Sequence, residues 1–221
     1  MALTSSDWIT IIGLLLTLTA FIAGLFQYRQ AQRWKALEFI SGEIKEFVAN
    51  RDVRNTTLML ERNRRPINFV SQFTNESNGE EKIVTVIVSD EMILSTLTYR
   101  LRKGSVTKEE GYIRDTFNTF FFYLSNFNHY IQVFGLVKYS DLHPYLGYWL
   151  EILSGKTNRK PAEFAEVVQQ YLEDHRYYGV QQLIRRHQVY TIKHPLQNNQ
   201  QRTHQSIEPT ITETTDKKTD S

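Results

Sequence analysis

A polar stripe on a predicted aromatic helix is the part of this sequence where residue types and spacing could support chemistry. Ser125 and His129 stand four residues apart, so on a helix their side chains share one face and could act as nucleophile and general base. No acidic residue that would orient the histidine is identifiable, and no glycine-rich turn presents the serine. We therefore favour a buried polar network, or a surface for a partner or ligand, over catalysis. The stripe consists of Asn118, Ser125, His129 and Gln132.

The other residue types that carry chemistry form no recognisable site. Among six histidines, no pair shows the HExxH spacing or another close metal-ligand spacing. The absence of cysteine excludes disulfides, thiolate zinc sites and cysteine nucleophiles. Neither GxxxxGK[ST] nor GxGxxG occurs, so the sequence predicts no glycine-rich nucleotide-binding loop. We expect no catalytic residue, no metal, no cofactor and no enzymatic activity.

The composition favours a helical protein that does not bind nucleic acid. The 221 residues carry a formal net charge of +2, whereas a dedicated nucleic-acid-binding domain is usually clearly basic. Only 10 glycines and 5 prolines occur, which favours helices over a turn-rich β-fold. The lack of cysteine also fits a reducing, cytosolic location for most of the chain.

The N-terminal hydrophobic segment predicts a transmembrane helix. No residue from Trp8 to Tyr28 is charged, and the most apolar part covers roughly 28 Å as a helix, close to a hydrocarbon core of about 30 Å. The rings of Trp8 and Tyr28 suit the two membrane interfaces. A cleaved signal peptide would need Lys or Arg before the run, and the only charge there is Asp7. A cleaved signal and a buried soluble helix are the less favoured alternatives.

The basic residues after this segment predict its orientation. Arg29, Arg33 and Lys35 follow the span, and the positive-inside rule places them in the cytoplasm. Together with Trp8 and Tyr28 they are the expected membrane-anchoring residues. Arg29, Arg33 and Lys35 are expected to form one basic region on the membrane side together with a second basic group, either as solvated surface or in contact with anionic headgroups. The second group consists of Arg62, Arg64 and Arg65.

Beyond the span, apolar residues at helical spacing predict one helix from about residue 7 to about residue 49. We interpret this stripe as packing against the rest of the domain, and a parallel coiled coil between tethered copies is the alternative. The stripe consists of Ala31, Trp34, Leu37, Ile40 or Ser41, Ile44, Phe47 and Val48.

The next segments predict a short helix, a loop and an ambiguous apolar run. Residues 51–65 resemble a helix ended by Pro66, and residues 67–82 resemble a loop. Residues 83–88, IVTVIV, are strand-like but have no evident partner, so we favour a buried extended segment or a helix start over a sheet. Ser89 resembles the N-cap of a further helix.

The strongest helix of the soluble part begins at the capping box of Thr107 and Glu110. Residues 116–137 are uncharged, but the polar residues among them favour a core helix over a second span. Two more helices are expected, one from Ser140 to Gly155 and one from Pro161 that continues to His187. The apolar face of the capped helix consists of Ile113, Phe117, Phe120, Leu124, Phe127, Ile131 and Phe134.

The predicted fold class is therefore all-α, with a transmembrane helix continuous with a cytosolic helical bundle and a disordered C-terminal tail. The tail is rich in Gln, Asn, Thr and Lys and has little to bury. The expected parts are a short extracytoplasmic N-terminus (1–7), the transmembrane helix (8–28), the cytosolic domain (29–194) and the tail (195–221).

This layout resembles a broad family of bacterial proteins that carry a domain of unknown function. The resemblance lies in QYRQAQR (27–33) after the span, EFISGEIKEF (38–47), FGLVKYSDL (134–142), WLEIL (149–153) and EDHRYYGVQQLI (173–184). It implies a bacterial inner-membrane location, a single N-terminal span and a cytosolic all-helical domain, and it implies no catalytic residues.

These features together predict a membrane-anchored interaction or regulatory module at the cytoplasmic face, with the N-terminus outside. The expected partners are the lipid bilayer and either another protein or further copies of the chain. One alternative is a small-ligand sensor or enzyme that uses the polar stripe. Another is an accessory subunit of a larger membrane complex.

Overall fold

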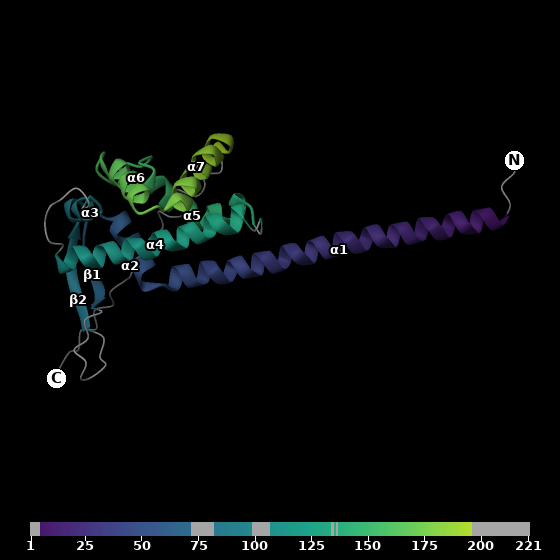
Figure 1. Cartoon of the computed structure of the whole chain (residues 1–221), viewed down its shortest axis with the longest axis horizontal. Coiled ribbons are helices and arrows are strands. Elements are labelled where there is room, and N and C mark those ends of the chain that lie inside the picture. The colour runs from purple at the N-terminus through teal and green to yellow at the C-terminus, as the bar shows by residue number, and fades with distance from the viewer. Residues whose placement is uncertain (1–4, 72–81, 99–106, 134, 136, 196–221) are drawn as a thin grey trace, which may run out of the picture.

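In the computed structural model, a long helical rod projects from a helical body (Figure 1). The structure describes residues 5–71, 82–98, 107–133, 135 and 137–195, without the side chains of residues 5–12, 71 and 82. The predicted tail from residue 196 onward and the first four residues of the predicted extracytoplasmic N-terminus lie outside the described residues. The described part is mostly helical and also contains one β-hairpin, so the prediction of an all-α fold was wrong in this respect.

The rod is α1 (Ser5–Ala49), and the predicted single helix through residue 49 is confirmed. Asn50 separates it from α2 (Arg51–Glu61). The Asn50 backbone N–H donates to the Glu46 carbonyl at 2.9 Å, while its side-chain oxygen accepts from the N–H groups of Asp52 and Val53 at 2.9 and 3.1 Å. One residue thus ends α1 and caps α2, which turns the chain sharply at the base of the rod (Figure 1).

The hairpin consists of β1 (Arg64–Ser71) and β2 (Lys82–Ser89), paired antiparallel. The predicted helix over 51–65 ends at Glu61, and Pro66 lies inside β1 rather than after a helix. A two-stranded hairpin has only edge strands, where a residue without an N–H is tolerated. The apolar run at 83–88 therefore does have a partner strand, in a segment that resembled a loop. The inward-facing residues of the hairpin are Ile67, Phe69, Val84, Val86 and Val88.

Two predicted helix starts are confirmed after the hairpin. Ser89 caps α3 (Asp90–Leu97) by accepting from the Met92 N–H at 3.3 Å. Thr107 caps α4 (Lys108–Gln132): its hydroxyl accepts from the Glu110 N–H at 3.1 Å, and the Glu110 carboxylate accepts from the Thr107 N–H at 3.0 Å.

The long helix α4 forms the centre of the body, with α5 (Tyr139–Leu153), α6 (Phe164–Asp174) and α7 (Tyr178–Lys193) on one side of it (Figure 1). The expected helix from Pro161 to His187 is in fact two helices, broken at Arg176, whose φ of 61° is not helical. Gly155 follows α5 with a φ of 70°, which glycine adopts at no steric cost. The predicted apolar face of α4 is confirmed as fully buried at Ile113, Phe117, Phe120, Leu124 and Phe127. Its remaining members are Ile131, which is partly buried, and Phe134, which lies outside the described residues.

Candidate functional site

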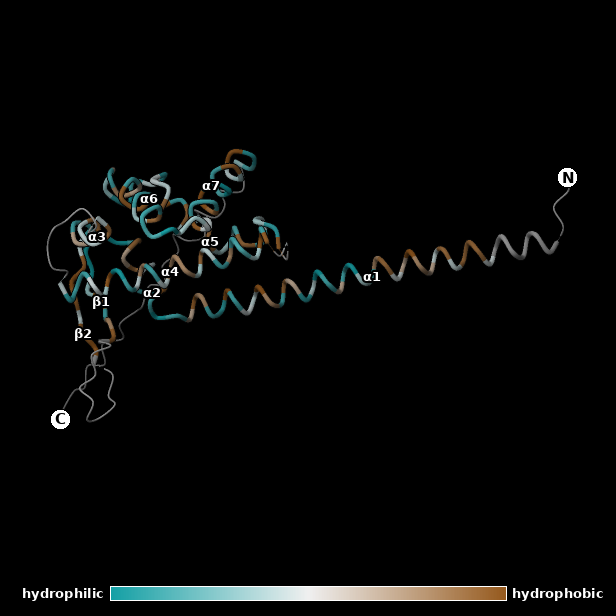
Figure 2. Tube along the Cα trace, in the orientation of Figure 1, coloured by the Kyte–Doolittle hydropathy of each residue, from teal (hydrophilic) through white to brown (hydrophobic). Residues whose placement is uncertain are grey.

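The outer half of α1 presents an apolar surface. Every side chain from Gly13 to Lys35 is exposed, and Phe26 reaches 70% exposure. Figure 2 shows mainly brown, hydrophobic turns of α1 next to its grey outer end, followed by more hydrophilic turns toward the body. Exposed apolar surface of this extent is typical of sites that contact a membrane or another protein. Its large members are Leu14, Leu15, Leu16, Leu18, Phe21, Ile22, Leu25 and Phe26.

The two threonines within this apolar segment are satisfied inside the helix. The Thr17 hydroxyl donates to the Gly13 carbonyl at 2.9 Å, and the Thr19 hydroxyl donates to the Leu15 carbonyl at 2.8 Å. A hydroxyl that bonds the carbonyl four residues earlier needs no partner from the surroundings. Both side chains are therefore compatible with an apolar environment.

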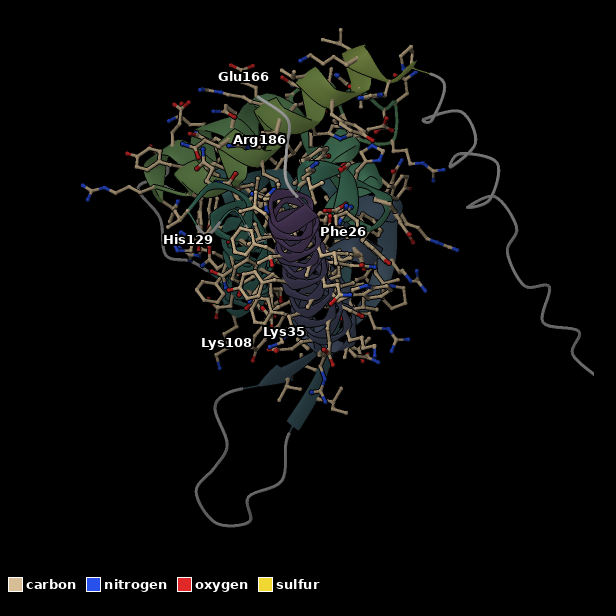
Figure 3. All side chains as sticks on the ribbon, turned by 90° about the vertical axis from the view of Figure 1, so that its right-hand side faces the viewer. Phe26, Lys35, Lys108, His129, Glu166 and Arg186 are labelled. Atoms are coloured by element: carbon tan, nitrogen blue, oxygen red, sulfur yellow. The ribbon has the colours of Figure 1, made fainter. Side chains whose placement is uncertain are left out.

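Among the described residues, no helix is both long enough and apolar enough to cross a membrane. The side chain of Trp8, at the start of the predicted span, lies outside the described ones. The anchoring residues predicted at the other end, Tyr28, Arg29, Arg33 and Lys35, are exposed on the rod. Figure 3, which looks along α1 from its N-terminal side, shows Phe26 and Lys35 on this rod in front of the body.

The apolar stripe predicted beyond the span is buried only in its last turns. Ile40, Ile44 and Phe47 are buried, but Trp34 is 66% exposed, so its predicted packing against the domain is wrong. The ring centroids of Phe47 and Phe127 of α4 lie 5.5 Å apart. The body thus packs against α1 from Ile40 onward. The helix between Tyr28 and Phe39, the stalk, is exposed except at the half-buried Ala36 and Leu37.

Two hydrogen bonds to carboxylates strengthen this junction. The Tyr130 hydroxyl donates to Glu43 at 2.8 Å, and the Tyr123 hydroxyl donates to Glu46 at 2.9 Å. Burial, together with the neighbouring Glu43 carboxylate, raises the pKa of Tyr130 to about 12, so the phenol remains a donor at neutral pH. The end of α1 is therefore fixed to α4 by both apolar and polar contacts.

The two predicted basic groups do not form one region on the membrane side. Arg62, Arg64 and Arg65 flank or lie in β1, at the end of the body farthest from the N-terminus (Figure 1). Lys35 lies about 22 Å earlier along α1 than Asn50, at about 1.5 Å per residue. The expected single basic region was wrong.

The polar stripe of α4 lies along its contact with α6 and α7. The Asn118 side-chain oxygen accepts from the hydroxyls of Tyr171 and Tyr177 at 2.7 and 3.2 Å. Ser125 is half-buried against Gly179 of α7, where an added β-carbon would lie 3.2 Å from the Ser125 Cα. These two residues belong to the seam between helices.

The other end of the stripe is open to solvent. His129 and Gln132 are exposed, and Figure 3 places His129 at the margin of the body. The buried Asn128 beside them donates to Gln132 at 3.2 Å and to Gln182 of α7 at 3.1 Å. The four residues of the stripe are thus spread along α4, from the seam with α6 and α7 to its exposed end.

A buried cluster of histidine and tyrosine between α5 and α7 was not predicted. Tyr139 and Nδ1 of His187 are hydrogen-bonded at 2.8 Å, and His143 stacks on His187 with ring centroids 5.7 Å apart. Burial lowers the pKa of His187 to about 4, helped by the positive potential of His143 and Lys156. Tyr139 and His143 are four residues apart on α5, but His187 lies more than forty residues later in the sequence, and no motif connects it to them. Within the described ranges, no three His, Asp or Glu side chains are arranged to hold a metal ion.

No family model matches the chain, and no curated protein and no solved structure matches it significantly. The resemblance to the bacterial family described above therefore stays a prediction.

Proposed function

We propose that this protein is a single-pass membrane protein whose helical body acts as an interaction or regulatory module at the cytoplasmic face of a bacterial inner membrane. One observation carries the proposal. A single unbroken helix, α1, carries an exposed apolar stretch over residues 13–26, yet packs into the body over its last turns. An uncharged stretch of this kind suits lipid, and the basic residues that follow it favour an orientation with the N-terminus outside.

The continuous rod would couple the body to the bilayer without a flexible linker. From Tyr28 to Ile40 the helix rises about 18 Å, which holds the body clear of the hydrocarbon region. The exposed stalk carries Trp34 and the half-buried Leu37, and large aromatic side chains are frequent anchors of protein interfaces. The stalk is therefore the surface that we propose for a protein partner or a second copy of the chain.

The polar stripe does not enter this proposal. Ser125 packs on Gly179, whereas His129 is exposed at the edge of the body, so the two side chains lie in different surroundings. An accessory subunit of a larger membrane complex is a specific form of the same proposal, in which the partner is the complex.

Site-specific photo-crosslinking in intact cells tests this function. The photoreactive residue p-benzoylphenylalanine would replace Trp34 on the stalk, and in a matched control it would replace Ile192, which is exposed near the end of α7. We expect a defined crosslinked product, a second copy or one partner, from position 34 and none from position 192. Recovery of only the uncrosslinked chain from position 34 would contradict the proposal.

A further inference from the structure

A groove of about 420 Å³ lies between α2 and β1 and is open to solvent along one side. This volume falls within the range of small-molecule sites, about 300–1,000 Å³. Its polar lining comes from Arg51, Arg54 and Asn55 of α2 and from Arg65 and Asn68 of β1. The groove is separate from the polar stripe and from the histidine cluster.

The lining is strongly positive. Arg51 and Arg54 are three residues apart on α2 and share one face, and Arg65 approaches from β1. None of the described residues that line the groove is acidic. Asp52, the acid in the same turn of α2, is directed toward α4, where its carboxylate accepts from the Thr119 hydroxyl at 3.4 Å. The three guanidinium groups in the lining suit a doubly charged anion.

The neutral polar residues of the groove, Asn55 and Asn68, are held by hydrogen bonds to each other and to β2. The Asn68 carbonyl accepts from the Asn55 side chain at 3.0 Å, and the Asn68 side-chain oxygen accepts from Thr85 at 2.8 Å. Each oxygen of Asn68 therefore already accepts one hydrogen bond from the protein. The N–H and C=O of one residue in an antiparallel strand point to the same side, so the Asn68 N–H faces α2 and the groove.

An apolar surface adjoins the arginines. Leu58 of α2, Val70 of β1 and Ile83 of β2 line the groove, and Ile83 is largely exposed. A ligand that places an anionic group on the arginines can lay an apolar or planar body on these side chains. From this combination we propose that the groove binds a small organic phosphate.

The phosphate ligand would come from the aqueous phase rather than from the lipid of the anchoring bilayer. This assignment of its source rests on the proposed function. The end of α1 at Ala49, two residues before Arg51, lies about 32 Å beyond Tyr28 at about 1.5 Å per residue. This separation is several times the Debye length of about 8 Å at physiological ionic strength. Headgroups beside the span are therefore out of reach of the groove.

Calorimetric titration of the full-length protein in neutral detergent micelles tests the proposal, with AMP and phenyl phosphate as probes and uncharged adenosine as the comparison. We expect both phosphates to bind and adenosine not to bind. The double variant Arg54→Gln/Arg65→Gln should bind the phosphates at least about tenfold more weakly, because each guanidinium makes charge-assisted hydrogen bonds. The control Arg185→Gln, at an exposed position on α7, should bind them as the wild type does.

The proposal is overturned if neither phosphate binds, if adenosine binds as tightly as AMP, or if both variants bind alike. Circular dichroism confirms that the double variant is folded, which is expected because neither side chain is fully buried. Retention of the same protein in carbonate-washed membranes is measured separately, so failure of the groove and failure of the anchor give different results.

Discussion

The phenolic oxygen of Tyr139 lies 2.8 Å from Nδ1 of His187, in a buried contact between the first turn of α5 and the middle of α7. The remaining ring nitrogen of His187, Nε2, is buried without a hydrogen-bond partner among the described residues, and so is Nε2 of His143, which stacks on it. A protonated imidazole in this place would carry an unsolvated charge. The contact therefore stabilises the fold only while both histidines are neutral.

The fold should lose stability as the pH falls from about 6.5 to about 4. Unfolded histidine binds a proton near pH 6.5, whereas burial lowers the pKa of folded His187 to about 4, so acid favours the unfolded chain throughout this window. Thermal melts of the wild type and of His187→Asn at several pH values check this. The wild type should lose melting temperature more steeply than the variant, and parallel pH dependences would contradict the assignment. Groups near the pair include Tyr190, His194, Glu151 and Lys156.

Gly179→Ala should cost stability relative to the same change at Gly111. Both glycines lie in helices, where alanine is favoured by about 0.8–1 kcal/mol. At Gly111 no atom lies within 4 Å of the added β-carbon, whereas at Gly179 it meets Ser125 of α4 at 3.2 Å. We expect Gly111→Ala to raise the free energy of unfolding, measured with denaturant. The Gly179→Ala variant should have a free energy of unfolding about 1–3 kcal/mol lower than that of Gly111→Ala. Equal effects would show that α4 and α7 do not approach so closely.

Removing the hydroxyls of Tyr123 and Tyr130 should loosen α1 from the body. The double change to phenylalanine keeps the rings and deletes both hydrogen bonds to Glu46 and Glu43. Because these groups are partly solvated, we expect a loss of only about 1 kcal/mol for each bond. Hydrogen exchange at residues 40–49 should accelerate, while exchange in α4 near Phe117 stays slow. Unchanged exchange at residues 40–49 would mean that the apolar contacts alone fix the junction.

Reporter fusions should reveal the proposed orientation. Green fluorescent protein at the C-terminus should fluoresce, and alkaline phosphatase at the same position should be inactive, because the basic residues after Tyr28 favour a cytoplasmic body. Changing Arg29, Arg33 and Lys35 to glutamine should reduce this preference. An active phosphatase fusion on the unchanged chain would refute an N-out orientation.

Local signals in the sequence predicted helix starts well. The caps at Ser89 and Thr107 depend on hydroxyls and on residues three positions away, and the structure has both. The single helix through Ala49 also followed from local spacing. Such interactions are complete within one turn of chain, so tertiary contacts have little opportunity to override them.

Features that depend on distant partners were missed. The strand β2 pairs with β1, whose sequence resembled the end of a helix at Pro66 followed by a loop. The sequence between residues 83 and 88 gives no sign of this distant partner. Trp34 fits the apolar spacing of α1, but this spacing does not show at which residue the helix begins to pack against the body. The hydrogen bond between Tyr139 and His187 joins positions 48 residues apart. The packing of Ser125 against Gly179 likewise depends on a helix that is distant in sequence.

The anchor is the central claim, and an alkaline carbonate wash of membranes from cells expressing the full chain tests it most directly. We expect the protein to stay in the pellet, and the variant Leu16→Lys/Ile22→Lys to be released, because each lysine near the centre of a span costs about 2.5–3.5 kcal/mol. Release of the unchanged, intact protein into the wash, or a mature chain that begins after Gly24, would contradict the account.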